Sequence, residues 1–145
     1  MDLISAVEGS WSWTGLRPVE VVGDNPFGNL IVKDEAGCYW RLCPEDLSCS
    51  VVASSRAELD ALSVDQEFLR DWYMTGLVEL AQQRLGPLRP GYRYCLKTPG
   101  PLGGEYGGDN LATLPLLELI GVSGHIAQQI RDLPEGAQVR LVVTE

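Results

Sequence analysis

The stretch from Leu102 to Pro134 constrains the fold most, because a glycine-rich loop leads directly into an apolar helix pattern. The loop, Leu102–Leu111, contains four glycines, and glycine permits backbone angles with positive φ that other residues resist. Apolar residues then recur at three- and four-residue intervals over residues 116–130, which is the spacing of one helix face. Pro115 suits the first helical position, and Pro134 predicts the end of the helix. We therefore expect a polar, sharply turned loop in front of a buried helix.

The N-terminal third of the chain predicts a β-meander. Trp11 and Trp13 alternate with serine and threonine, a pattern typical of a strand with one aromatic face. Residues 34–37 have the composition of a hairpin connection, and turn residues also separate the other apolar segments. The further strands are expected at residues 19–22, 30–33, 38–42 and 50–53.

The hydrophobic period changes at Ser55, where helices are predicted. Ser55 and Glu58 have the spacing of a capping box, which indicates a short helix over about residues 56–62. The same signal at Ser63 opens a longer helix that is expected to run to about Leu85. Strands are predicted at residues 92–97 and 138–144. Together these elements predict a single α+β domain over residues 1–145, with a largely antiparallel sheet and two main helices packed on one face.

Charge and composition exclude several classes of function. The formal net charge of −9 argues against non-specific binding to nucleic acid or to anionic membranes, because both need a positive field. It is compatible with a basic protein partner. No apolar run approaches the ~18–20 residues of a membrane span, and the N-terminus lacks the features of a secretory signal. The cytoplasm is therefore the expected location, where the four cysteines should be reduced thiols.

No cofactor, metal site or catalytic residue is predicted. The spacing of Cys38, Cys43 and Cys49 is not that of a structural zinc site, so the cysteines are expected mainly as small core residues. A metal site that joins Cys43 and Cys49 to His125, the single histidine, is a weaker alternative. On a helical wheel, His125 falls on a polar face. The glycine loop lacks the Lys-Ser/Thr pair of a P-loop, and Glu105 would repel phosphate.

Several segments of the sequence resemble one bacterial family. They are Phe27-Gly28-Asn29-Leu30; Tyr39-Trp40-Arg41-Leu42-Cys43-Pro44-Glu45; Leu102-Gly103-Gly104-Glu105-Tyr106 with Asp109-Asn110-Leu111; Ser123–Pro134; and the expected final strand. Over roughly residues 20–145 the chain resembles the C-terminal domain of type VI secretion immunity proteins that neutralise DNase effectors, a family long listed as of unknown function. The F-G-N-L segment alone also recurs in SUKH-type immunity proteins.

The resemblance implies a binding protein rather than an enzyme, one that binds a toxin and blocks it stoichiometrically. A basic nuclease would suit the negative charge of the chain. Immunity members of the family often carry an additional N-terminal domain, whereas only about 25 residues precede Phe27 here. A stand-alone relative with a different partner therefore stays open, as does a homo-oligomer.

The residues expected to contact the partner lie in the glycine loop and on the helix that follows it. Carboxylates on a loop can accept charge-assisted hydrogen bonds from arginine or lysine of a partner. The candidates are Glu105, Tyr106, Asp109 and Asn110, with Glu118 and Asp132 as flanking charges. Two alternatives remain: a small-molecule sensor or hydrolase with a pocket at the Gly100–Gly108 loop that holds Glu105 or His125, and a structural or oligomerising module.

Overall fold

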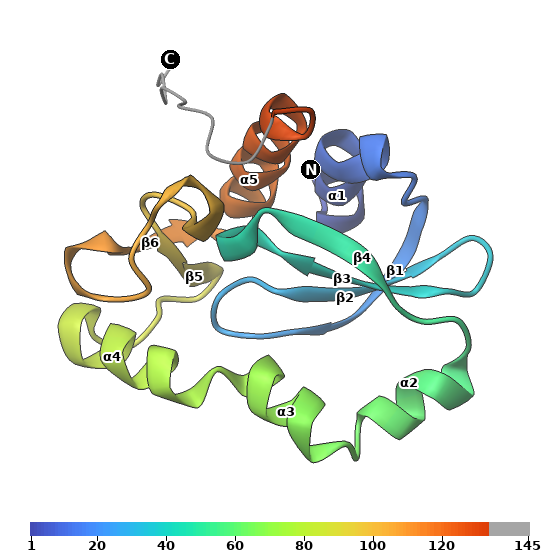
Figure 1. Cartoon of the computed structure of the whole chain (residues 1–145), viewed down its shortest axis with the longest axis horizontal. Helices are drawn as coiled ribbons and strands as arrows, with labels where there is room; N and C mark the ends of the chain where they lie inside the picture. Colours follow the sequence, from blue (N-terminus) through green and yellow to red (C-terminus); the bar gives the residue numbers. More distant parts are fainter. Residues whose placement is uncertain (134–145) are drawn as a thin grey trace.

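The computed structural model describes residues 1–133 of the 145 and shows a mixed α+β fold (Figure 1). This confirms the fold class predicted from the sequence. The expected strand at residues 138–144 lies outside the described residues. The helices are α1 (Leu3–Trp11), α2 (Arg56–Leu62), α3 (Gln66–Tyr73), α4 (Thr75–Leu85) and α5 (Leu116–Ile130). The strands are β1 (Pro18–Asp24), β2 (Leu30–Asp34), β3 (Tyr39–Cys43), β4 (Ser48–Ala53), β5 (Tyr92–Leu96) and β6 (Leu111–Pro115). Short 3-10 turns occur at η1 (Ser12–Thr14), η2 (Pro44–Asp46), η3 (Gly100–Leu102) and η4 (Gly108–Asn110).

The first four strands form an antiparallel sheet in chain order, as a meander requires. The hairpin between β2 and β3 is closed by Asp34, whose Oδ1 accepts the N–H groups of Ala36 at 2.9 Å and Cys38 at 2.8 Å. Gly37 supplies the positive φ of 88° that this turn needs. Strands β5 and β6 pair in a separate two-stranded antiparallel sheet.

Helices cover both faces of the four-stranded sheet (Figure 1). Leu30 and Val32 of β2 belong to the core cluster that includes residues of α1 and α5. Ile31 points the other way and joins the cluster that contains Phe68 and Trp72 of α3. This differs from the expectation that both main helices pack on one face. The reason is visible in β2, since a run of consecutive apolar residues is typical of a strand buried on both sides.

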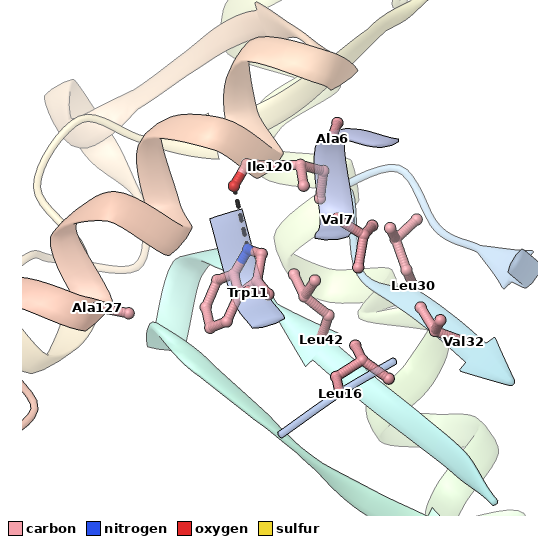
Figure 2. Close-up of a cluster of buried hydrophobic side chains, with 9 residues drawn as sticks. All are labelled: Ala6, Val7, Trp11, Leu16, Leu30, Val32, Leu42, Ile120 and Ala127. Carbon is pink, nitrogen blue, oxygen red and sulfur yellow. Dashed lines mark hydrogen bonds between the residues drawn. The ribbon is translucent and has the colours of Figure 1, made fainter. Parts of the chain in front are cut away.

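The core between the sheet, α1 and α5 is centred on Trp11 (Figure 2). Trp11 is fully buried, and its indole Nε1 donates to the carbonyl oxygen of Ile120 in α5 at 3.1 Å. The predicted strand at Trp11 and Trp13 is wrong, because Trp11 ends α1 and Trp13 lies in η1. Val7 and Trp11 are both buried and four residues apart, which is helical spacing. Burial of this helix face outweighs the short serine–tryptophan alternation.

The long helix expected from Ser63 to Leu85 is divided in two. Helix α3 starts after Asp65, whose carboxylate accepts the N–H groups of residues 67 and 68. The chain then turns at Met74, where φ is 50°. Asn25, in the connection between β1 and β2, donates its side-chain Nδ2 to the carbonyl oxygen of Trp72 at 2.8 Å. This bond occupies an acceptor at the end of α3 and so favours the break.

Helix α5 contacts both α1 and the two-stranded sheet, so it joins the two parts of the molecule. Gly124 of α5 lies against Ser10 of α1: a Cβ at Gly124 would lie 2.4 Å from the carbonyl oxygen of Ser10. The absence of a side chain therefore lets the two helices pack closely. Among the described residues, no helix combines the length and the apolar character needed to cross a membrane.

Candidate functional site

The glycine-rich loop connects β5 to β6, and Asn110 holds it closed. The side-chain Nδ2 of Asn110 donates to the carbonyl oxygens of Thr98 at 2.9 Å and of Glu105 at 2.7 Å. Its Oδ1 accepts the N–H of Thr98 at 2.8 Å. These three bonds use the polar groups of the Asn110 side chain within the loop. Asn110 thus positions the loop, and its side chain has little capacity left for a partner.

Two glycines of this region meet steric requirements that a side chain would violate. A Cβ at Gly104 would lie 1.7 Å from the carbonyl oxygen of Thr98, and one at Gly100 would lie 2.1 Å from the hydroxyl of Tyr106. The glycines therefore allow the loop to fold back onto itself. The ring of Tyr106 and the carboxylates of Glu105 and Asp109 stay exposed. The shape of the loop is fixed by its own contacts.

The loop presents Glu105, Tyr106 and Asp109 at the surface. The Tyr106 hydroxyl donates to the Asp46 carboxylate in η2, and its pKa is raised by burial and by the negative charge of Asp46. Asp109 forms an ion pair with Arg84 of α4, although its side chain is 93% exposed. The structure thus anchors the loop on one side to η2 and on the other to α4.

The two flanking charges lie near opposite ends of α5. Glu118 is exposed in the first turn, and Asp132 is exposed just beyond the last turn, beside Arg131. At ~1.5 Å of rise per residue, the helix from Glu118 to its end at Ile130 spans about 18 Å. The structure therefore groups the four loop candidates and spreads the other two along α5.

A pocket of about 240 Å³ lies beside the loop, between η2, β5, β6 and α5. Its walls are largely apolar and include Phe27, Leu96, Leu119, Val122 and Ile126. Glu45 and Lys97 also line it, as does Pro99 at the base of the glycine loop. The lining contains neither Glu105 nor His125, the two residues on which the sensor or hydrolase alternative was built.

Glu45 is the end of a chain of polar contacts that runs through the core. Its carboxylate oxygens accept from the side-chain Nδ2 of Asn29 at 3.1 and 2.9 Å. The Oδ1 of Asn29 in turn accepts from Arg41 Nη2 at 3.0 Å, and Arg41 pairs with Asp71 on the far side of the sheet. Burial raises the pKa of Glu45 to about 7, with a smaller contribution from neighbouring Asp46.

Comparison with known families decides the identity of this domain. Residues 53–127 match the family described as "T6SS immunity protein Tdi1, C-terminal", which is more than half of the chain. The chain belongs to this family. It is a family of immunity proteins of the type VI secretion system (T6SS), so the resemblance stated from the sequence is confirmed. No curated protein sequence matches the chain.

The match to the Tdi1 C-terminal family includes the glycine loop and most of α5. It runs from the last residue of β4 through α2, α3, α4, β5 and β6. The segments Phe27–Leu30 and Tyr39–Glu45, which also carried the resemblance, precede the matched residues. Those two segments supply Asn29 and Glu45.

All four cysteines are buried or half-buried thiols, and His125 lies on the surface of α5. Burial raises the pKa of the Cys43 and Cys49 thiols to about 12 and that of Cys95 to about 11, so these thiols stay protonated at neutral pH. His125 lies on the exposed face of α5, 3.0 Å from the side chain of Gln129. Because the thiols of Cys43, Cys49 and Cys95 stay protonated, they are poor nucleophiles.

Within residues 1–133, the side chains that could together hold a metal ion are those of Cys43, Glu45 and Asp46. Their ligand atoms lie within 4.8 Å of one another. The Cys43 thiol is protonated at neutral pH, and the Glu45 carboxylate already accepts from Asn29. This group differs from the weaker metal alternative considered from the sequence, which joined Cys43 and Cys49 to His125.

Sequence reasoning missed Glu45 and Asn29 as parts of the site. A glutamate after a proline in a short turn normally indicates an exposed residue. One signal was present, since both residues lie inside segments that carried the family resemblance. A carboxylate and an amide within two such segments are a reason to suspect a buried pair.

Proposed function

We propose that this chain is a non-enzymatic immunity protein of the cytoplasm that neutralises a secreted toxin by binding it stoichiometrically. Membership of the T6SS immunity family carries this proposal. The site supports it further, because the acidic loop is exposed, shaped by its own hydrogen bonds and unlike a catalytic centre. A preformed loop loses little conformational entropy when it binds, so its contacts contribute more fully to affinity.

Three loop residues would make the direct contacts. The carboxylates of Glu105 and Asp109 would accept charge-assisted hydrogen bonds from basic residues of the toxin, and the half-exposed ring of Tyr106 would pack between them. The ion pair between Asp109 and Arg84 is exposed. Asp109 could therefore leave Arg84 and pair with a basic residue of the toxin at little cost in free energy. Asn110 would position the loop, with Glu118 and Asp132 as outlying charges.

The net charge of −9 supports a basic toxin, of which a nuclease is an example. Opposite charges speed the encounter of two proteins and disfavour partners of like charge. This effect is screened by salt, since the Debye length shortens from about 30 Å at 0.01 M to about 10 Å at 0.1 M ionic strength. The association rate should therefore fall as salt is added.

The proposal is tested by purifying the product of the neighbouring gene as the candidate toxin and titrating a fixed, active amount of it with increasing amounts of the chain. A stoichiometric inhibitor abolishes toxin activity at one equivalent, and the end point does not move with incubation time. An enzyme that inactivates the toxin would instead act far below one equivalent and progressively. Inhibition at a small fraction of an equivalent would contradict the proposal, as would full toxin activity with the chain in excess.

A further inference from the structure

The pocket beside the loop is smaller than most pockets that hold drug-sized small molecules. Its volume is about 240 Å³. Pockets for drug-sized small molecules usually enclose about 300–1,000 Å³. The apolar walls formed by Leu119, Val122 and Ile126 suit methylene groups. An apolar stem with a polar end, such as a long side chain of a protein partner, suits a pocket of this size and lining.

Glu45 is the acidic residue among those that line the pocket. Glu45 is only 5% exposed, yet it lines the cavity. Its side-chain partner is the neutral amide of Asn29. Within residues 1–133, no lysine or arginine forms an ion pair with Glu45. A carboxylate offers about four acceptor positions, so capacity remains for another donor.

The pocket and the acidic loop are parts of one surface. Asp46 follows Glu45 in η2 and receives the hydroxyl of Tyr106 from the loop. Pro99, at the base of the same loop, lines the pocket. A protein that contacts the loop can therefore reach the pocket with a neighbouring side chain.

We propose that the pocket receives an arginine side chain of the toxin, whose stem packs against α5 and whose guanidinium group pairs with Glu45. This inference rests on the proposed function, in which the chain binds a toxin. Arginine suits the site because its planar guanidinium pairs with carboxylates in a fork and is more weakly hydrated than the ammonium group of lysine. Arginine is also enriched among the anchor residues of protein interfaces.

Lys97 is the group in the lining that opposes this assignment. It is exposed, so its ammonium group remains hydrated, whereas Glu45 lies inside the wall. An arginine occupant predicts that Lys97→Ala strengthens toxin binding by about two- to fivefold, because an exposed like charge is removed. An acidic occupant predicts the reverse. The effect of Lys97→Ala on affinity thus reports the sign of the occupant's charge.

The direct test fills the pocket from its exposed side. Val122 lines the pocket and is 51% exposed, so Val122→Trp can block the cavity without disturbing the core. Leu117, on the same helix, is 40% exposed and is not among the lining residues, so Leu117→Trp is the matched control. We expect Val122→Trp to weaken toxin binding at least about tenfold and Leu117→Trp to change it less than about threefold. Equal effects of the two variants would overturn the proposal.

A small probe separates this inference from the proposed function. Addition of n-butylguanidinium to the free chain should shift the amide NMR signals of residues around the pocket, whereas neutral pentanamide should shift them much less. Glu45→Gln and Val122→Trp should each abolish the response to n-butylguanidinium.

If the toxin binds but Val122→Trp and Glu45→Gln leave its affinity unchanged, the pocket assignment is wrong and the immunity role stands. If the toxin does not bind the wild-type chain but the probe responds as expected, the immunity role fails alone. A pocket that responds equally to both probes contradicts the arginine assignment.

Discussion

At the residue scale, Glu45 is the buried carboxyl group of the described residues, and it is held in an environment that disfavours its charge. Burial is the main reason that its pKa rises to about 7, and the neighbouring Asp46 adds to the rise. The amide of Asn29 and the charge of Arg41 act in the opposite direction. The thiol of Cys43, which lies near the Glu45 carboxyl group, keeps its proton over the same pH range. Folding is therefore coupled to proton binding at Glu45.

This coupling predicts how stability changes with pH. Below about pH 4.5, the usual pKa of glutamate, the carboxyl group is protonated in the folded and unfolded states alike. Between about pH 4.5 and 7, the unfolded state loses this proton while the folded state keeps it, so the contribution of Glu45 to stability falls and is lost once pH has risen through 7. Each pKa unit corresponds to about 1.4 kcal/mol, so the free energy of unfolding should fall by about 3 kcal/mol across this window. Urea denaturation at a series of pH values measures the fall.

Glu45→Gln provides the control for this prediction, because glutamine does not ionise. The variant should show a flatter dependence of stability on pH between about 4.5 and 7 than the wild type. Wild-type and variant curves that stay parallel over this window would rule out Glu45 as the source of the pH dependence.

Residues of the loop were easier to place from the sequence than Glu45. The glycines around Glu105 and Asp109 predict a turn, and turns lie at the surface. The burial of Glu45 instead depends on Asn29, which is sixteen residues earlier, and on the packing of α5. Local composition does not encode such distant contacts.

At the element scale, the packing of α5 on α1 depends on glycine. Gly124→Ala should destabilise the fold by about 1–3 kcal/mol, because the added Cβ would meet the backbone and side chain of Ser10 and α1 would have to shift. Gly121→Ala, in the same helix, would place its Cβ 3.7 Å from the Ser10 hydroxyl, which is an ordinary contact. That variant should be stabilised by up to about 1 kcal/mol, since alanine favours helix. Thermal denaturation of the two variants checks the prediction, and destabilisation of both by the same amount would contradict it.

Elements with local signals were predicted well, and those that depend on distant contacts were not. The apolar period correctly predicted a helix at α5, although Pro115 is its N-cap and not its first helical residue. Ser55 correctly predicted the cap of α2, where its hydroxyl accepts the N–H of Glu58. The break between α3 and α4 was missed because Asn25, which bonds to Trp72, is 47 residues away along the chain. The apolar period alone predicts one continuous helix there.

At the scale of the whole molecule, helices cover both faces of the four-stranded sheet (Figure 1). Helix α5 joins that sheet to the β5–β6 pair, which holds the loop at its end. The excess of acidic residues gives the chain a field that would draw a basic toxin toward it. Family membership, charge and a braced acidic loop thus support the same function.

The central claim is that the acidic loop holds the toxin, and calorimetric measurement of toxin affinity tests it most directly. Glu105→Ala with Asp109→Ala should weaken binding at least about tenfold, because charge-assisted hydrogen bonds are lost. Glu20→Ala with Glu35→Ala removes the same charge from exposed positions on β1 and the β2–β3 turn, and should change affinity less than about threefold. Unchanged affinity of the loop variant, or equal weakening of both double variants, would contradict the account.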